Sequence, residues 1–150
     1  MLLRKGWTPS DSIAYTRVEK FAQLFILQMM SQTPEILNTI AQVIYDRKGF
    51  NILALDVRGL SSITDFLLIA EGNVDRHVSS IGQAIIHELD ERGEDPAFVE
   101  GLKTGDWAVL DYGEIMVHIF SPGLRERYSL ERLWKDSKIV DLTINTSALG

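Results

Sequence analysis

Four carboxylates are the side chains best placed for chemistry, because each lies at the end of a predicted strand: Asp56, Asp65, Asp111 and Glu114. Acidic groups in such places hold Mg²⁺ in enzymes that transfer phosphoryl groups. However, the sequence has no Asp-x-Asp pair on one strand face and no glycine-rich phosphate loop. Asp65 follows a turn rich in serine and threonine, where a carboxylate typically accepts backbone hydrogen bonds. We favour structural roles for these acids. The alternative is a metal-dependent nucleotidyltransferase with Asp56, Asp65 and Asp111 as Mg²⁺ ligands.

The three histidines do not suggest a metal site. His77 and His87 lie ten positions apart on one predicted helix, which is too far for a pair of ligands. His118 lies between Met116 and Phe120 on one face of a predicted strand, where a structural or interface histidine is favoured over a catalytic base. We therefore expect neither a metal nor a cofactor.

Cysteine is absent, which excludes disulfides, thiolate zinc sites, iron–sulfur clusters and cysteine nucleophiles. The serine pairs at positions 61–62 and 79–80 lack the Gly-x-Ser-x-Gly context of a serine hydrolase. These serines are expected in turns and on helix surfaces.

A cluster of aromatic and acidic residues predicts a protein-binding surface instead. Trp107 follows Asp106 and is close in sequence to Glu100, Asp111 and Glu114. Tryptophan, tyrosine and arginine are enriched among residues that dominate binding energies, and acidic groups around them attract a partner rich in lysine and arginine. A tryptophan on a strand can equally well belong to the hydrophobic core. The sequence leaves both interpretations of Trp107 open.

Two amphipathic helices are predicted ahead of this cluster. Thr33 can cap the first helix, Pro34 suits its first helical position, and Gly49 fits its exit. Asp75 can cap the second helix, whose apolar stripe spans residues 78–89 and which Gly93 closes.

Four strands are predicted between and after these helices. Asn51–Val57 is β-like, and Phe66–Ala70 is apolar throughout, as expected for a strand at the centre of a sheet. Alternating residues over 107–111 and 115–120 predict a hairpin, followed by a short helical pattern that ends at Trp134. This order indicates the α/β class, with a mixed β-sheet and helices packed on it rather than a Rossmann-type alternation.

Composition limits the choice of partner and compartment. With 150 residues, 45% of them hydrophobic, the chain suits one domain with an ordinary core. Its net charge of −6 disfavours direct nucleic-acid binding and favours a basic protein as partner. The apolar run at 21–30 is far shorter than the ~20 residues that cross a bilayer, and no secretory signal is recognisable. We expect a cytoplasmic protein that does not enter membranes.

The sequence predicts one domain with a segment on each side of it. We expect an N-terminal extension over residues 1–32, a domain over 33–141 and a C-terminal tail over 142–150. One hypothesis for the extension is an overlong start assignment, with translation beginning at Met29 or Met30; the other is a genuine helix that covers the domain.

Several short motifs recur along the chain in a characteristic order. They are SSITDFLLIAEG at 61–72, RHV at 76–78, VEG at 99–101, DW at 106–107, DYG at 111–113, VHIF at 117–120 and LERLW at 130–134. Together with Arg125 and Tyr128, they resemble the ribosomal silencing factor, or Iojap, family over roughly residues 34–141.

The resemblance implies a protein without enzymatic activity that binds the large ribosomal subunit through ribosomal protein uL14. Bound there, it would block joining of the small subunit and damp translation when nutrients are scarce. It also implies a nucleotidyltransferase-like topology without catalytic machinery, and a possible homodimer. A role in assembly of the large subunit would use the same binding site and is a second alternative.

The resemblance also assigns the partner-binding residues. Trp107 corresponds to the family's aromatic anchor, Glu100 and Asp111 would pair with basic side chains, and Arg125 and Tyr128 would make rim or supporting contacts. The full set of expected partner-binding residues is Glu100, Gly101, Trp107, Asp111, Tyr112, Gly113, His118, Arg125 and Tyr128.

Overall fold

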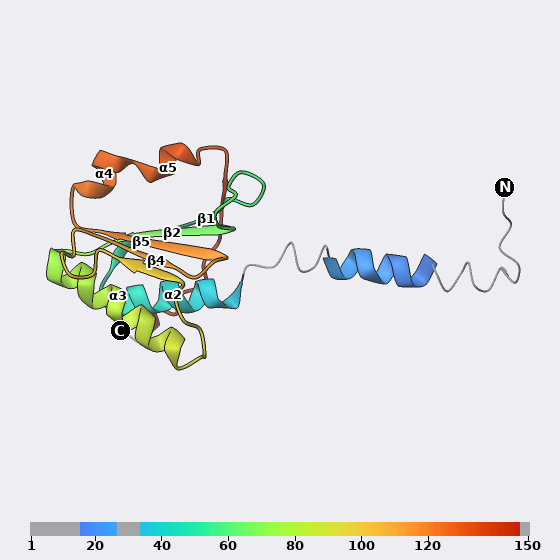
Figure 1. Cartoon of the computed structure of the whole chain (residues 1–150), viewed down its shortest axis with the longest axis horizontal. Helices are drawn as coiled ribbons and strands as arrows, with labels where there is room; N and C mark the ends of the chain where they lie inside the picture. Colours follow the sequence, from blue (N-terminus) through green and yellow to red (C-terminus); the bar gives the residue numbers. More distant parts are fainter. Residues whose placement is uncertain (1–15, 27–33, 148–150) are drawn as a thin grey trace, which may run out of the picture. The chain divides into compact units, whose positions relative to one another are not determined.

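The computed structural model describes residues 16–26 and 34–147 of a chain that divides into two units, Met1–Thr33 and Pro34–Gly150 (Figure 1). In the first unit, residues 16–26 are helical. Among the described residues, no helix combines the length and apolar character needed to cross a bilayer. The expected cap Thr33 and the hypothetical start sites Met29 and Met30 lie outside the described residues.

A six-stranded mixed sheet forms the centre of the second unit. The strands are β1 (Phe50–Asp56), β2 (Phe66–Glu71), β3 (Phe98–Glu100), β4 (Trp107–Asp111), β5 (Ile115–Phe120) and β6 (Lys138–Ile139). Their spatial order is β3-β4-β5-β2-β1-β6, in which β2 and β5 run parallel and the other neighbours antiparallel. Residues 66–70 of β2 are buried, which confirms the predicted centre of the sheet.

Helices α2 (Glu35–Asp46) and α3 (Asp75–Asp90) cover one face of the sheet (Figure 1). Their apolar stripes form because hydrophobic residues recur every three to four positions. The stripes pack against inward-facing strand residues in the larger of two hydrophobic cores, whose fully buried members include Leu37, Ile40, Ile44, Leu68, Ile81, Ile85, Leu89, Leu110, Val117 and Ile119. We call this side the α2–α3 face.

The short helices α4 (Leu124–Tyr128) and α5 (Leu130–Leu133) lie over the opposite face, which we call the α4–α5 face (Figure 1). They contribute to a smaller core in which Leu124, Leu130 and Trp134 pack on the sheet. The strand residues of this core come from β1, β2, β4 and β5, and they are Leu53, Leu55, Leu67, Ile69, Trp107, Met116 and Phe120. Strand alternation therefore gives the two faces separate cores.

The N-cap residues of α2 and α3 each differ by one position from those that the sequence predicted. Pro34 is the N-cap of α2 rather than its first helical residue, because its ψ of 131° is not helical. Val74 is the extended N-cap of α3, so Asp75 is the first helical residue and makes no side-chain cap hydrogen bond. Its carboxylate instead adds negative charge to the first turn, where the helix dipole favours it.

Two strands were not predicted, and both lie at the edges of the sheet. β3 has three exposed residues and β6 has two, so neither shows the alternation that identifies a strand. Beyond β6, Leu142 and Ile144 pack against the larger core, and the amide of Thr143 donates to Asn38 Oδ1 at 2.9 Å. The first part of the expected tail therefore contacts α2.

Candidate partner-binding surface

Trp107 lies at the start of β4 and is partly buried. Its indole N–H donates to His118 Nδ1 at 3.0 Å. The ring centroid lies 5.0 Å from that of Phe120 and 4.8 Å from that of Tyr128, distances at which aromatic rings attract one another. One edge of Trp107 therefore belongs to the smaller core, while the side chain remains partly accessible. The core interpretation of Trp107 therefore holds for part of the ring, and its role in binding a partner stays a prediction.

His118 holds Trp107 in place. The imidazole is 7% exposed, and burial lowers its pKa to about 4, so it is neutral near pH 7. Because Nδ1 accepts the indole hydrogen bond, the ring proton resides on Nε2. The structural role expected for His118 therefore has a geometric basis in this hydrogen bond.

The register of the sheet brings further residues to the same face. Phe98 pairs with Asp111, Glu100 with Val109, and Val109 with His118. Directly opposed residues of antiparallel strands point to the same side of a sheet. Together with Trp107 these residues form one surface, which we call the β3–β5 patch: Phe98, Glu100, Trp107, Val109, Asp111 and His118.

The β3 end of this patch is open. Phe98 is 52% exposed and Glu100 is exposed, so no described element covers them. Tyr128 of α4 lies beside Trp107 and is itself 49% exposed. The patch thus combines an accessible aromatic centre with two carboxylates, Glu100 and Asp111. Phe98 was missed in the sequence because its role depends on the pairing of β3, and its exposure appears only in the folded chain.

The hairpin turn divides the predicted residues between the two faces. Asp111 Oδ1 accepts a hydrogen bond from the Gly113 amide at 2.8 Å, and Gly113 has a φ of +84°, which suits glycine. Tyr112 packs against the larger core, and burial raises its pKa to about 12. Asp111 and Gly113 therefore shape the edge of the patch, whereas the Tyr112 side chain lies on the α2–α3 face.

Gly101 has a steric role. Its φ is +83°, and a Cβ atom at this position would lie 1.8 Å from the Trp107 carbonyl oxygen. Nearby, Asp106 Oδ1 accepts hydrogen bonds from the Thr104 hydroxyl and the Trp107 amide, and these lower the pKa of Asp106. Gly101 and Asp106 therefore fix the backbone on which Trp107 is carried.

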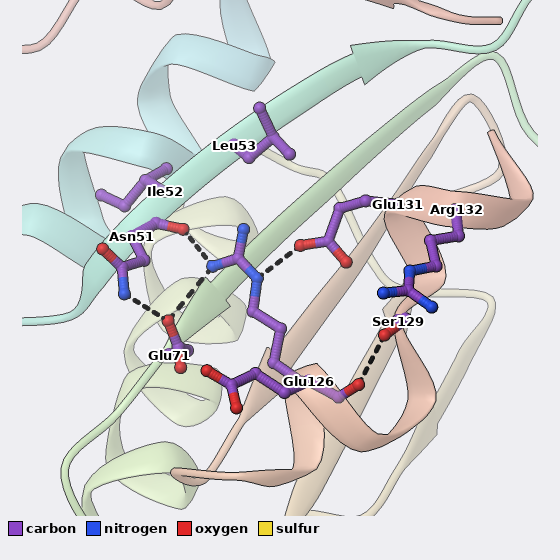
Figure 2. A pocket seen from close by; sticks show the side chains of 9 residues that line it. Asn51, Ile52, Leu53, Glu71, Glu126, Ser129, Glu131 and Arg132 are labelled. Atoms are coloured by element: carbon purple, nitrogen blue, oxygen red, sulfur yellow. Dashed lines mark hydrogen bonds and ion pairs between the residues drawn. The ribbon is translucent and has the colours of Figure 1, made fainter. Parts of the chain in front are cut away.

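Arg125 is directed into the molecule. Its Nε donates to Glu131 Oε1 at 2.6 Å, and its Nη1 lies 3.3 Å from Glu71 Oε2 and donates to the Asn51 carbonyl. Figure 2 shows Asn51, Glu71 and Glu131 on the wall of the pocket, about 600 Å³ in volume, where these contacts are made. The side chain of Arg125 is 13% exposed. These contacts hold the guanidinium in an internal ion cluster, and its expected contact with a partner stays a prediction.

The strand-end acids are not gathered into a metal site. Among the described residues, no group of three or more histidine, aspartate and glutamate side chains is arranged to hold a metal ion. Asp56 pairs with Arg58 at 2.6 Å, and this hydrogen-bonded contact lowers the Asp56 pKa. The backbone carbonyl of Asp65 accepts a hydrogen bond from the Val57 amide, and the backbone amide of Asp65 donates to the Glu114 carbonyl. The arrangement required by the nucleotidyltransferase alternative, with Asp56, Asp65 and Asp111 around one Mg²⁺, is absent from these residues.

The remaining candidates also have local structural partners. His77 Nδ1 accepts from the Asn73 amide, and its Nε2 lies 2.6 Å from the Arg47 carbonyl. His87 lies 3.4 Å from Glu91 on the surface of α3. The Ser61 hydroxyl accepts from the Ile63 amide within a turn, and the Ser79 hydroxyl donates to the Leu102 carbonyl. The Ser61 contact fits the predicted turn role, whereas the half-buried Ser79 connects α3 to the loop that follows β3.

Comparison with known proteins identifies the family. Residues 30–148 match the family model described as ribosomal silencing factor during starvation. A ribosomal silencing factor of Bacillus subtilis (strain 168) is 37% identical over 107 residues, which cover 71% of this chain and 91% of the relative. A crystal structure of a Chromobacterium violaceum protein has a TM-score of 0.66 and 28% identity, and the match covers 75% of this chain and 93% of that chain.

A more distant relative comes from Mus musculus and is named mitochondrial assembly of ribosomal large subunit protein 1. It is 25% identical over 101 residues, which cover 65% of this chain and 44% of the relative. The family-model match over residues 30–148 includes both cores and the whole β3–β5 patch. The chain therefore belongs to the ribosomal silencing factor family.

Proposed function

We propose that this protein binds the large ribosomal subunit through ribosomal protein uL14 and sterically blocks joining of the small subunit. In this mechanism the protein performs no chemistry on its partner. Occupancy of the joining surface is sufficient, so the strength and lifetime of binding determine how far translation is reduced.

The observation that carries the proposal is the open β3–β5 patch beside Tyr128. Its centre consists of Phe98, Trp107 and Val109, and its carboxylates are Glu100 and Asp111. Large aromatic side chains next to acidic groups suit a partner surface that presents lysine and arginine side chains around an apolar centre. The net charge of −6 would speed the approach of such a basic protein surface.

Sedimentation with purified ribosomal subunits tests the proposal. We expect the protein to migrate with large subunits and to lower the yield of joined ribosomes when small subunits are added. Phe98→Ala should weaken binding about tenfold, because it removes an exposed aromatic ring from the patch. Ile139→Ala is the matched control, since Ile139 is 71% exposed on β6 at the opposite edge of the sheet.

Equal binding by the Phe98 and Ile139 variants would place the contact outside the patch. Cross-linking of the bound protein would then be needed to locate it, and the failure of uL14 to cross-link would contradict the proposed partner. Failure of the wild-type protein to bind large subunits at all would contradict the proposed function itself.

An assembly function is the second candidate. It is favoured by the name of the mouse relative, which refers to assembly of the ribosomal large subunit. The two functions share a binding partner and differ in their consequence. Binding that leaves subunit joining unchanged, together with accumulation of incomplete large subunits in cells lacking the protein, would favour assembly.

A further inference from the structure

We propose that Arg125 positions Tyr128 against Trp107 and thereby forms the α4 side of the partner-binding surface before the partner arrives. This inference rests on the proposed function for its effect on binding. It assigns to Arg125 a positioning role in place of a contact with the partner, and it adds Glu71, Glu131 and the Asn51 carbonyl as the groups through which Arg125 acts.

The guanidinium of Arg125 connects four elements of the structure. Arg125 belongs to α4, Glu131 to α5, Glu71 to the end of β2, and Asn51 to β1. The side chains of Arg125 and Glu71 are each 13% exposed, so their ion pair is largely shielded from water. Hydrogen bonds between charged groups in such surroundings are stronger and more directional than surface ion pairs. The cluster therefore ties both short helices to the edge of the sheet.

The backbone around the cluster is adapted to it. Asn51 has a φ of 50°, in the left-handed region, and the β1–β2 register shifts between Phe50 and Leu53. The Asn51 side chain donates to Glu71 Oε2 at 2.6 Å. A non-glycine residue in this conformation costs free energy unless neighbouring contacts hold it. Here the Asn51 side chain and carbonyl both make contacts within the cluster.

Helix α4 needs such an anchor. It has five residues, and its C-cap Ser129 has a φ of 46°. A helix this short has little stability of its own, because nucleation costs more than its few hydrogen bonds return. Tyr128 is three positions after Arg125, so the two side chains lie on one side of the helix turn. Fixing Arg125 therefore fixes the ring of Tyr128, 4.8 Å from that of Trp107.

Two of the three guanidinium nitrogens of Arg125 are engaged within the molecule. Its Nε is taken by Glu131, and its Nη1 is shared by Glu71 and the Asn51 carbonyl. A partner acidic group that approached Nε or Nη1 would have to displace one of these acceptors. Tyr128, in contrast, is 49% exposed and needs no rearrangement to be reached.

Fluorine NMR of protein labelled with 5-fluorotryptophan tests the positioning step without a partner. The chain has three tryptophans, and the Trp107 resonance is the one lost in Trp107→Phe. Glu131→Gln, which removes one charge of the cluster at constant shape, should shift the Trp107 resonance. Glu88→Gln is the matched control, because it removes the surface partner of Arg92 on α3, 3.2 Å away, and should leave that resonance unchanged.

A double-mutant cycle tests the consequence for binding. Glu131→Gln should weaken binding to large subunits about fivefold, as expected for loss of one charge-assisted hydrogen bond. In a Tyr128→Ala background the same change should weaken binding by less than about twofold, because the residue through which it acts is gone. Circular dichroism melting should show that all variants remain folded at the binding temperature.

The two experiments distinguish positioning of Tyr128 by Arg125 from a direct contact between the Arg125 cluster and the partner. An unshifted Trp107 resonance in Glu131→Gln overturns the positioning role. Equal losses of affinity with and without Tyr128 show that Arg125 or Glu131 contacts the partner directly, and they also overturn it. If the wild-type protein fails to bind large subunits, the proposed function fails, whereas a shifted resonance would still support positioning of Tyr128 by the cluster.

Discussion

At the scale of single residues, the patch depends on groups that bind nothing themselves. His118 accepts the hydrogen bond of the Trp107 indole from a position with 7% exposure, and Gly101 permits a backbone approach that a side chain would block. Both were expected to be partner-binding residues. Their contacts lie within the molecule, so substitutions there should act on stability and on the orientation of Trp107.

His118 predicts a dependence of stability on pH. Its pKa is about 4 in the folded chain and near 6.5 in the unfolded one, so the unfolded state takes up a proton first as the pH falls. The contribution of neutral His118 to the free energy of unfolding is therefore fully present above pH 6.5. It is lost as the pH falls from 6.5 to 4, and the total loss is on the order of 3 kcal/mol.

Denaturant unfolding of the wild-type protein and His118→Gln across pH 4–7 measures this effect. Glutamine does not titrate and offers an amide oxygen to the Trp107 indole. The free energy of unfolding of the variant should fall less steeply below pH 6.5. Parallel pH profiles for the two proteins would show that His118 is not the titrating group.

Two glycines of the hairpin region give a second prediction. Gly101→Ala should destabilise the fold by on the order of 3 kcal/mol or more, because the new Cβ would lie 1.8 Å from the Trp107 carbonyl oxygen. Gly113→Ala should cost only about 1 kcal/mol, since its strain is conformational and no atom lies within 4 Å. Thermal or urea unfolding checks the difference, and equal losses would show that the steric contact relaxes.

At the scale of elements, the helices and strands whose signals lie within their own residues could be predicted from the sequence, whereas those that depend on pairing with distant residues could not. The helices α2 and α3 and the strands β4 and β5 carry periodic patterns within their own residues, and β1 and β2 are short β-like or apolar runs, so the existence and type of these six elements were predicted correctly. β3 and β6 exist because β4 and β1 offer them hydrogen bonds. Nothing in the three residues Phe98–Glu100 identifies a strand, although this strand contributes Phe98 and Glu100 to the patch.

The residues of the candidate site also divide into those that local patterns predict and those that depend on distant contacts. Trp107, Glu100 and Asp111 could be placed on one surface from the hairpin pattern and from the resemblance to the family. The cluster around Arg125 could not, because Asn51 and Glu71 are 74 and 54 positions away in sequence. Local patterns carry no information about such distant pairs. The direction of an arginine side chain becomes clear only when its acceptors are known.

The sheet topology predicts a gradient of local stability. β2 and β5 have hydrogen-bonded neighbours on both sides and helices over both faces, whereas β3 and β6 each pair on one side only. Amide hydrogen exchange should therefore be about 100-fold slower or more in β2 and β5 than in β3 and β6. Exchange followed by mass spectrometry or NMR measures this ratio. Similar rates across the sheet would indicate that opening requires unfolding of the whole unit.

At the scale of the whole molecule, the two cores and the proposed partner-binding surface all lie in the second unit. Every buried hydrophobic residue of the two cores lies between Leu37 and Phe120. The β3–β5 patch and the Arg125 cluster also lie after residue 34. Residues 1–32 precede all of these residues in the chain. We propose that they form an extension to a domain that suffices for ribosome binding.

A chain that begins at residue 33 tests this division. It should unfold at the same denaturant concentration as the full chain, because the apolar surface buried in both cores is unchanged. Its affinity for large subunits should also stay within about twofold, since all patch residues are retained. Unfolding of the shortened chain would show that the first unit stabilises the second. Normal stability with weakened binding would instead assign residues 1–32 a contact with the ribosome, and the partner-binding surface would then extend beyond β3, β4, β5 and α4.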